Sequence, residues 1–111
     1  MKTCISRWLG VWTVVVFSLS YAMAEPVHVR LATDWYPQPE HGGFYQALLK
    51  GYNQAGGLEV ETLPGGPNAF AVQRVGTGRA DFGMGSGDDV LMANDRGIPV
   101  VAVGATMQND P

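Results

Sequence analysis

Cysteine is almost missing from this chain, which has one cysteine, Cys4, among its 111 residues. The residues beyond it therefore have no disulfide bonds, no thiolate for zinc and no cysteine nucleophile, and must be stabilised by packing alone. Positive charge is also scarce, because seven Lys and Arg stand against ten Asp and Glu, with no basic cluster. Since nucleic-acid binding depends on concentrated positive charge, nucleic acid is excluded as an expected partner.

A long apolar run is found only near the N-terminus. Two basic residues precede an apolar run over residues 8–19, and small residues follow at Ala22-Met23-Ala24. The run is about a dozen residues, whereas a helix that spans a bilayer needs roughly 20. A positive start, a short apolar run and a small-residue end are typical of a secretory signal peptide. We predict a signal peptide over residues 1–24, cleaved after Ala24, and export of residues 25–111; a retained anchor is the alternative.

The rest of the sequence alternates between strand patterns and helix patterns. Strands are predicted over residues 27–31, 58–63, 79–84 and 99–105, separated by helices over residues 44–55, 68–76 and 86–96. The last strand is almost continuously apolar, which is typical of a strand buried on both faces. Regular alternation of strand and helix predicts an α/β fold with a parallel sheet and helices on both sides.

Aromatic, polar and glycine residues cluster in the loops that follow the first three predicted strands, over residues 34–43, 64–68 and 85–89. In an open parallel sheet, ligands bind at the carboxyl ends of the strands, where such loops converge. The candidate ligand-binding residues on or beside these loops are Asp34, Trp35, Tyr36, His41, Tyr45, Gly65, Gly66 and Ser86.

The first loop has the most informative side chains. Trp35 and Tyr36 offer flat faces for stacking a heteroaromatic ring, worth about 0.5–1.5 kcal/mol per aromatic pair beyond burial; packing against the neighbouring helix is the alternative. Asp34 is a candidate acceptor for an amino group on such a ring, or it caps the next turn. His41 is either a hydrogen-bond partner for a ring nitrogen or a solvent-exposed residue at a helix start. We predict no metal site, because His28 lies within a strand and no third ligand has a recognisable spacing.

The other candidates also have structural alternatives. The Tyr45 hydroxyl can face a ligand from the following helix, although core packing is the favoured interpretation. Gly65-Gly66 lacks the Lys and Ser/Thr of a P-loop, but glycine loops present backbone N–H groups to polar ligands. Ser86 lies three residues before Asp89, as in a capping box, so it either contacts a ligand or caps the helix. No cofactor is predicted.

Two segments have a specific combination of residues: Leu-Ala-Thr-Asp-Trp-Tyr-Pro over residues 31–37 and His-Gly-Gly-Phe-Tyr over residues 41–45. Together with residues 57–60, 78–83 and 97–103, they give the sequence a pattern that resembles the periplasmic binding proteins for thiamine pyrimidine precursors, alkanesulfonates and nitrate. The later segments are shared by many binding proteins of this fold. The first two point to the pyrimidine branch.

This resemblance implies a type II periplasmic-binding-protein-like fold with two lobes, of which residues 25–111 form the first part of lobe 1 and lack lobe 2. It also implies a periplasmic component of an ABC transporter, with no enzymatic step, that delivers an aminopyrimidine-like solute to a membrane permease; sulfonate or nitrate is less favoured. One alternative is a truncated fragment that binds nothing. Another is an enzyme of thiamine-pyrimidine biosynthesis, but the fungal enzymes of this fold have a cysteine-rich motif that residues 25–111 lack.

Overall fold

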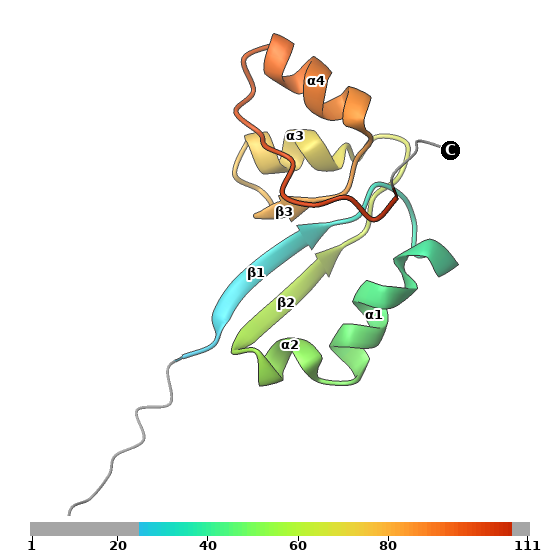
Figure 1. The fold of residues 1–111 in the computed structure, drawn as a ribbon, viewed down its shortest axis with the longest axis vertical. Helices are drawn as coiled ribbons and strands as arrows, with labels where there is room; N and C mark the ends of the chain where they lie inside the picture. The colour runs from blue at the N-terminus through green and yellow to red at the C-terminus, as the bar shows by residue number, and fades with distance from the viewer. Residues whose placement is uncertain (1–24, 108–111) are drawn as a thin grey trace, which may run out of the picture.

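The computed structural model describes residues 25–107, so the predicted signal peptide over residues 1–24 lies outside the described residues. The described part is an α/β arrangement around one small sheet (Figure 1). Its elements in chain order are β1 (Val27–Ala32), the 3-10 helix η1 (Pro39–His41), α1 (Gly42–Leu49), α2 (Tyr52–Ala55), β2 (Leu58–Leu63), α3 (Ala71–Gly76), β3 (Phe82–Gly83) and α4 (Gly87–Asp95).

The sheet has three parallel strands in the order β2-β1-β3, which confirms the predicted parallel α/β class. The central strand, β1, pairs with β2 along its whole length, from Val27 opposite Leu58 to Ala32 opposite Leu63. β3 pairs with β1 over only two residues, opposite the last two residues of β1. Because the strands are parallel, their carboxyl ends and the loops that follow lie at one edge of the sheet.

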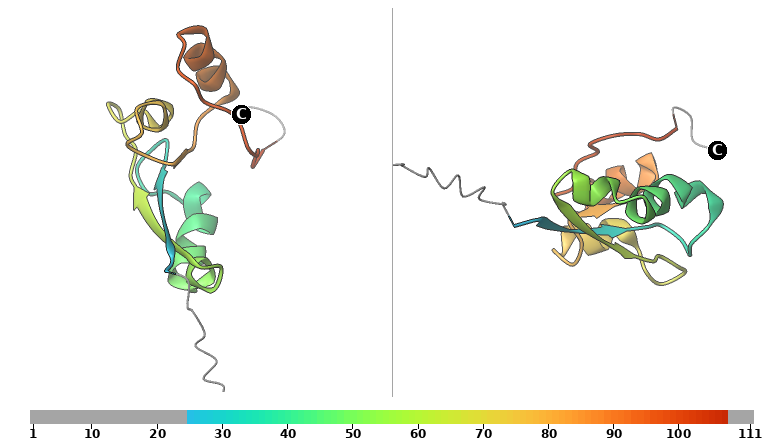
Figure 2. Two further views of the ribbon diagram at one scale, coloured as in Figure 1. Left: turned by 90° about the vertical axis from the view of Figure 1, so that its left-hand side faces the viewer. Right: turned by 90° about the horizontal axis from the view of Figure 1, so that it is seen from below.

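The helices lie on both faces of the sheet, as Figure 2 shows for α1 and α3. The strand order explains this arrangement. The chain steps from β1 to β2 in one direction and then crosses back over β1 to reach β3. Crossovers between parallel strands are right-handed, so two steps in opposite directions place their helices on opposite faces.

An ion pair fixes β3 against β1. The Arg30 guanidinium donates to both carboxylate oxygens of Asp81, at 3.1 and 3.0 Å, and the Arg30 backbone N–H donates to Asp81 Oδ2 at 2.8 Å. The Asp81 N–H in turn donates to the Arg30 carbonyl at 2.9 Å. These bonds to Arg30 lower the pKa of the Asp81 carboxyl below its ordinary value. They position the short strand that leads to the third loop.

The helix predicted over residues 44–55 is interrupted. α1 ends at Leu49 and α2 begins at Tyr52, with Gly51 between them at a φ of 72°. Glycine adopts this left-handed conformation without steric cost, which permits a change of direction that the periodicity of the apolar residues does not reveal. The predicted end of the helical segment at residue 55 is confirmed, because α2 ends at Ala55 and Gly57 follows with a φ of 74°.

The prediction of a fourth strand over residues 99–105 is wrong, because no residue after α4 is in a strand in the part of the chain that the structure describes. Val101 and Val103 are 83% and 78% exposed, and Val100 is the buried residue of this run. A strand buried on both faces needs a hydrogen-bonded neighbour. The adjacent edge strand, β3, is only two residues long and offers too short a ladder.

The helix predicted over residues 68–76 starts later than expected, and Asn68 does not cap it. α3 begins at Ala71, after Phe70, and no side chain caps its start. The chain turns earlier, since the Ala69 N–H donates to the Gly66 carbonyl at 3.0 Å. Asn68 therefore lies in the turn that precedes the helix.

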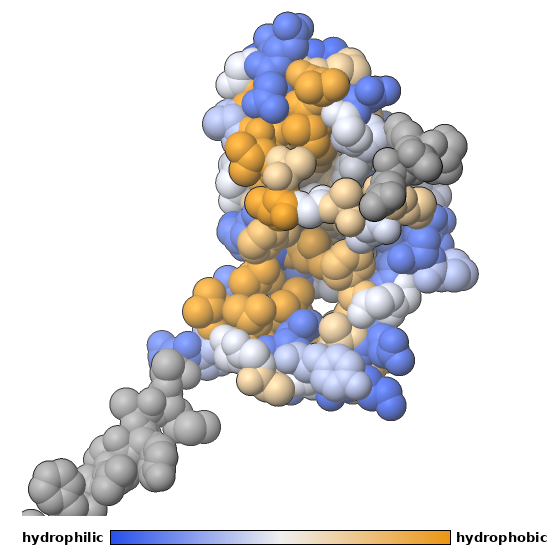
Figure 3. Space-filling view, in the orientation of Figure 1, coloured by the Kyte–Doolittle hydropathy of each residue, from blue (hydrophilic) through white to orange (hydrophobic). Residues whose placement is uncertain are grey.

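The core is small. Its buried cluster consists of Ala32, Ala71 and Ala80, with Leu63 and Val75 packed against it. Large apolar side chains such as Phe82 and Leu91 are 48% and 69% exposed, and Figure 3 shows apolar surface over the sheet and over α4. No helix within residues 25–107 is long and apolar enough to cross a membrane.

Candidate functional site

The three predicted loops meet at the carboxyl edge of the sheet. The first and second loops are bonded directly, because the Gly65 N–H donates to the Trp35 carbonyl at 3.1 Å. Met84 directly precedes the third loop, and its N–H donates to the Ala32 carbonyl at the end of β1 at 2.9 Å. Asp34 and Met84 line the same cavity. The convergence on which the binding hypothesis depends is therefore present.

Thr33, which is not among the predicted binding residues, joins the first two loops. Its side chain is fully buried, and its hydroxyl donates to the Trp35 carbonyl at 2.8 Å while accepting the Gly65 N–H at 3.1 Å. A buried hydroxyl with two such bonds stabilises one loop conformation. The available signal was a threonine at the end of a strand, directly before the aspartate and the aromatic pair.

The two glycines of the second loop pack closely against the first loop. A side chain on Gly65 would place its Cβ only 2.3 Å from the Thr33 carbonyl oxygen, so only glycine fits there. Gly66 lies under the Tyr36 ring, where a Cβ would be 3.2 Å from Tyr36 Cζ. The Gly65 N–H, a candidate donor to a ligand, is used within the protein instead.

The aromatic pair is half-exposed beside these contacts. Trp35 is 44% exposed and Tyr36 is 56% exposed, and their rings meet edge to face with centroids 5.8 Å apart. Neither side chain is buried in the core. Both therefore keep surface for stacking a planar ring.

Asp34 and His41 form the main polar pair of the site. His41 is fully buried, and its Nε2 lies 2.8 Å from Asp34 Oδ1, so the alternative of a solvent-exposed histidine is wrong. The Asp34 side chain is 45% exposed, which leaves part of its carboxylate accessible to a ligand. Glu40 lies nearby, with Oε1 3.7 Å from His41 Nε2. The imidazole therefore holds Asp34 in place while Asp34 faces outward.

Tyr45 and Ser86 are placed in ways that favour their structural alternatives. The Tyr45 hydroxyl is buried and has no hydrogen-bond partner among residues 25–107. Ser86 caps α4 in a full capping box, since the Asp89 N–H donates to Ser86 Oγ and the Ser86 N–H donates to Asp89 Oδ2, each at 3.1 Å. The predicted capping box is confirmed, and the ligand roles of both side chains stay predictions.

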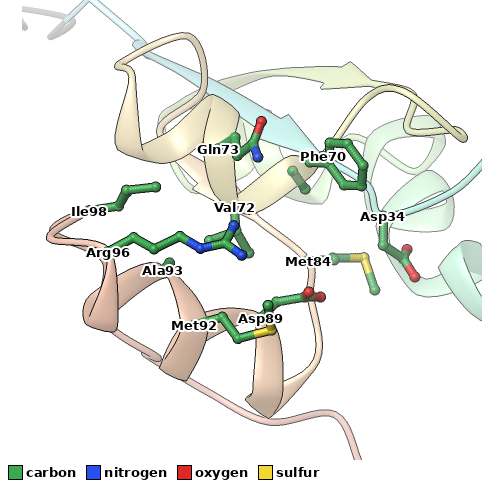
Figure 4. A pocket seen from close by; sticks show the side chains of 11 residues that line it. Asp34, Phe70, Val72, Gln73, Met84, Asp89, Met92, Ala93, Arg96 and Ile98 are labelled. Carbon is green, nitrogen blue, oxygen red and sulfur yellow. The ribbon is translucent and has the colours of Figure 1, made fainter.

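A cavity of about 250 Å³ opens between α3, α4 and the first loop (Figure 4). Phe70, Val72 and Met84 give it apolar walls, while Asp34, Gln73, Asp89 and Arg96 supply polar groups. Of the eight predicted binding residues, Asp34 alone lines this cavity; Trp35 follows it in the chain, and His41 contacts its carboxylate. The candidate site thus combines an aromatic pair and a carboxylate with an adjacent mixed cavity.

Comparison with known proteins identifies relatives over most of the chain. The family model described as NMT1/THI5 like matches residues 38–111. A 4-amino-5-hydroxymethyl-2-methylpyrimidine phosphate synthase of Aspergillus parasiticus is 29% identical over 79 residues, covering 71% of this chain and 23% of the relative. The synthase THI11 of Saccharomyces cerevisiae is 31% identical over 83 residues, covering 75% of this chain and 24% of the relative.

A formylaminopyrimidine-binding protein of Halalkalibacterium halodurans is similarly related. It is 29% identical over 82 residues, covering 73% of this chain and 24% of the relative. The chain thus spans about a quarter of the length of these curated relatives. No solved structure matches the chain significantly.

Proposed function

The chain belongs to the NMT1/THI5-like family, and we propose that it serves as the solute-binding component of an ABC transporter that captures an aminopyrimidine-type solute. The observation that carries this proposal is the convergence of an exposed aromatic pair and a held carboxylate at one sheet edge. Export to the periplasm and delivery to a membrane permease are parts of the same proposal. They are supported by the signal-peptide pattern over residues 1–24.

An aminopyrimidine fits the chemistry of this site. Its ring can stack on Trp35 or Tyr36, and its amino group can donate to the exposed part of the Asp34 carboxylate. Because Asp34 is already positioned by His41, little side-chain entropy is lost when a ligand binds. A relative that is named a formylaminopyrimidine-binding protein supports this ligand class.

Anionic solutes fit the site less well. Asp34 and Asp89 line the cavity and Glu40 stands beside it, whereas Arg96 is the cationic side chain in the cavity lining. An excess of carboxylates repels an anion and lowers its local concentration. Sulfonate and nitrate are therefore the less favoured ligands.

Binding without chemistry is favoured over a synthase role, although some relatives are named as synthases. Within residues 25–107, the polar partners of His41 Nε2 are carboxylates, and no hydroxyl or thiol is bonded to its ring. A nucleophile paired with a base is thus not assembled there. A fragment that binds nothing is the remaining alternative, and the first experiment separates it from the proposal.

The test uses tryptophan fluorescence. The chain has three tryptophans, Trp8, Trp12 and Trp35, so the W8F/W12F variant reports on Trp35 alone. We expect saturable quenching by 4-amino-5-hydroxymethyl-2-methylpyrimidine, and little response to nitrate or methanesulfonate. A response to the anions without one to the pyrimidine overturns the ligand assignment. No response to any of the three overturns binding by this chain.

A further inference from the structure

Three potential metal ligands come together on the loop between β1 and α1. One ligand atom each of Asp34, Glu40 and His41 can be chosen so that all lie within 4.8 Å of one another. Two of the separations are 2.8 Å, from His41 Nε2 to Asp34 Oδ1, and 3.7 Å, from His41 Nε2 to Glu40 Oε1. The prediction of no metal site rested on a missing third ligand, and the fold supplies Glu40 in that place.

These separations suit a small divalent ion. Zinc binds imidazole nitrogen and carboxylate oxygen at about 2.0–2.2 Å, so two ligand atoms of a tetrahedral site lie roughly 3.3–3.6 Å apart. The observed distances of 2.8 and 3.7 Å lie on either side of that range. The Asp34 and Glu40 side chains are half-exposed, so they have room to rotate toward a bound ion.

Hydrogen bonds around the cluster help to position His41 and Glu40. The His41 ring is fully buried, yet its Nε2 points at both carboxylates. The His41 backbone N–H donates to the Gln38 carbonyl at 3.0 Å, and the Gln38 side-chain amide donates to Glu40 Oε1; the ring Nδ1 of His41 has no hydrogen-bond partner among residues 25–107. An amide that holds a carboxylate is the kind of outer contact that orients metal ligands.

We propose that Asp34, Glu40 and His41 bind a divalent transition-metal ion. One nitrogen and two carboxylate oxygens suit zinc, manganese or ferrous iron, whereas magnesium and calcium prefer oxygen alone. Three protein ligands leave at least one coordination position for water or for a solute atom. The two carboxylates balance the charge of the ion. The metal site shares Asp34 with the proposed pyrimidine site, but it needs neither aromatic residue, and Glu40 belongs to the metal site alone.

The chain offers a matched control for the experiment. His28 Nε2 lies 3.0 Å from Glu59 Oε2, so this exposed pair has the same chemistry as Asp34–His41, with no third ligand among residues 25–107. A surface histidine–carboxylate pair that collects metal adventitiously would behave like this control. Cys4 is a separate potential zinc ligand and is replaced by serine in every variant.

The experiment is calorimetric titration of the full C4S chain with zinc chloride alone. We expect one zinc ion per chain, with affinity lowered at least about tenfold by E40Q and unchanged within about twofold by E59Q. Glu40 is half-exposed, and glutamine keeps an oxygen for the Gln38 amide, so E40Q should retain the far-UV circular dichroism of the parent. If E40Q does perturb folding, E40A replaces it as the test variant, because Asp34 and His41 also belong to the proposed pyrimidine site.

Three results would overturn the proposal. They are no zinc binding by the full C4S chain, equal affinity in the E40Q variant, or a loss in E59Q as large as in E40Q. Pyrimidine quenching of Trp35 is measured on the same E40Q variant in the absence of metal. Its retention shows that a failure of the metal site leaves the proposed solute binding intact, and the two proposals are thereby distinguished.

Discussion

Replacing Gly65 with alanine should disrupt the junction of the first two loops. The new Cβ would lie 2.3 Å from the Thr33 carbonyl oxygen and 2.5 Å from the Asp34 carbonyl oxygen, both of which belong to the backbone. Backbone atoms cannot rotate away as a side chain can, so the loops must separate. Forcing an extra carbon into a packed site costs about 1–3 kcal/mol.

Separation of the loops also weakens the hydrogen bonds of the Gly65 N–H. It donates to Thr33 Oγ1 and to the Trp35 carbonyl, each at 3.1 Å. A typical hydrogen bond contributes about 0.5–1.5 kcal/mol. Replacing glycine by alanine restricts the unfolded chain, which offsets about 0.4–1 kcal/mol. We therefore expect G65A to lower the free energy of unfolding by about 2–3 kcal/mol.

The assay is urea denaturation followed by circular dichroism, with Trp35 fluorescence as a local probe in the W8F/W12F background. G43A is the matched control, because a Cβ on Gly43 meets nothing within 4 Å and the residue lies in α1. Alanine is favoured over glycine in a helix by about 0.5–1 kcal/mol, so this control should be slightly stabilised. If G65A unfolds at the same urea concentration as the parent, the close approach of the loops is refuted.

Three further changes test the parts that hold the loops. T33V should lower the free energy of unfolding by about 1–3 kcal/mol in urea melts, because valine removes the hydroxyl that accepts the buried Gly65 N–H. T62V on β2 is the control, and an equal loss of stability in the two variants would contradict the role of Thr33. S86A should cost about 0.5–2 kcal/mol by removing the α4 cap, measured in the same way, whereas an unchanged midpoint would mean that the capping box is unimportant. Since Arg30 lowers the pKa of Asp81, the ion pair stabilises the fold above the ordinary carboxyl pKa of 3.8 and loses that effect as pH falls through the lowered value. D81N should therefore flatten the acid side of the urea midpoint plotted against pH, and an unaltered profile would show that this pair is not involved.

Much of the architecture could be predicted because local patterns determine it. The alternating residues of β1 and β2 and the glycine after α2 reflect local requirements, and the structure meets them. The parallel sheet follows from the alternation of elements. The capping box of Ser86 and Asp89 involves only four consecutive residues, so the sequence alone was enough.

Features that depend on distant contacts could not be predicted in this way. Thr33 is important because Gly65, 32 residues later, approaches it, and no local pattern marks that approach. Glu40 joins Asp34 and His41 because η1 folds the loop back on itself. The burial of His41 likewise depends on tertiary packing, whereas its position before a helix suggested exposure to solvent.

A fourth strand was wrongly predicted because strand formation depends on neighbouring strands that a local sequence pattern does not reveal. An apolar run such as residues 99–105 indicates a segment that would be stable as a strand between two other strands. It does not indicate whether those two strands are present. β1 has partners on both sides and is the strand whose last residue, Ala32, is fully buried. Val101 and Val103 lack such partners in the described residues and stay exposed. The binding loops, by contrast, depend on the ends of β1, β2 and β3, so their geometry is formed without the missing fourth strand.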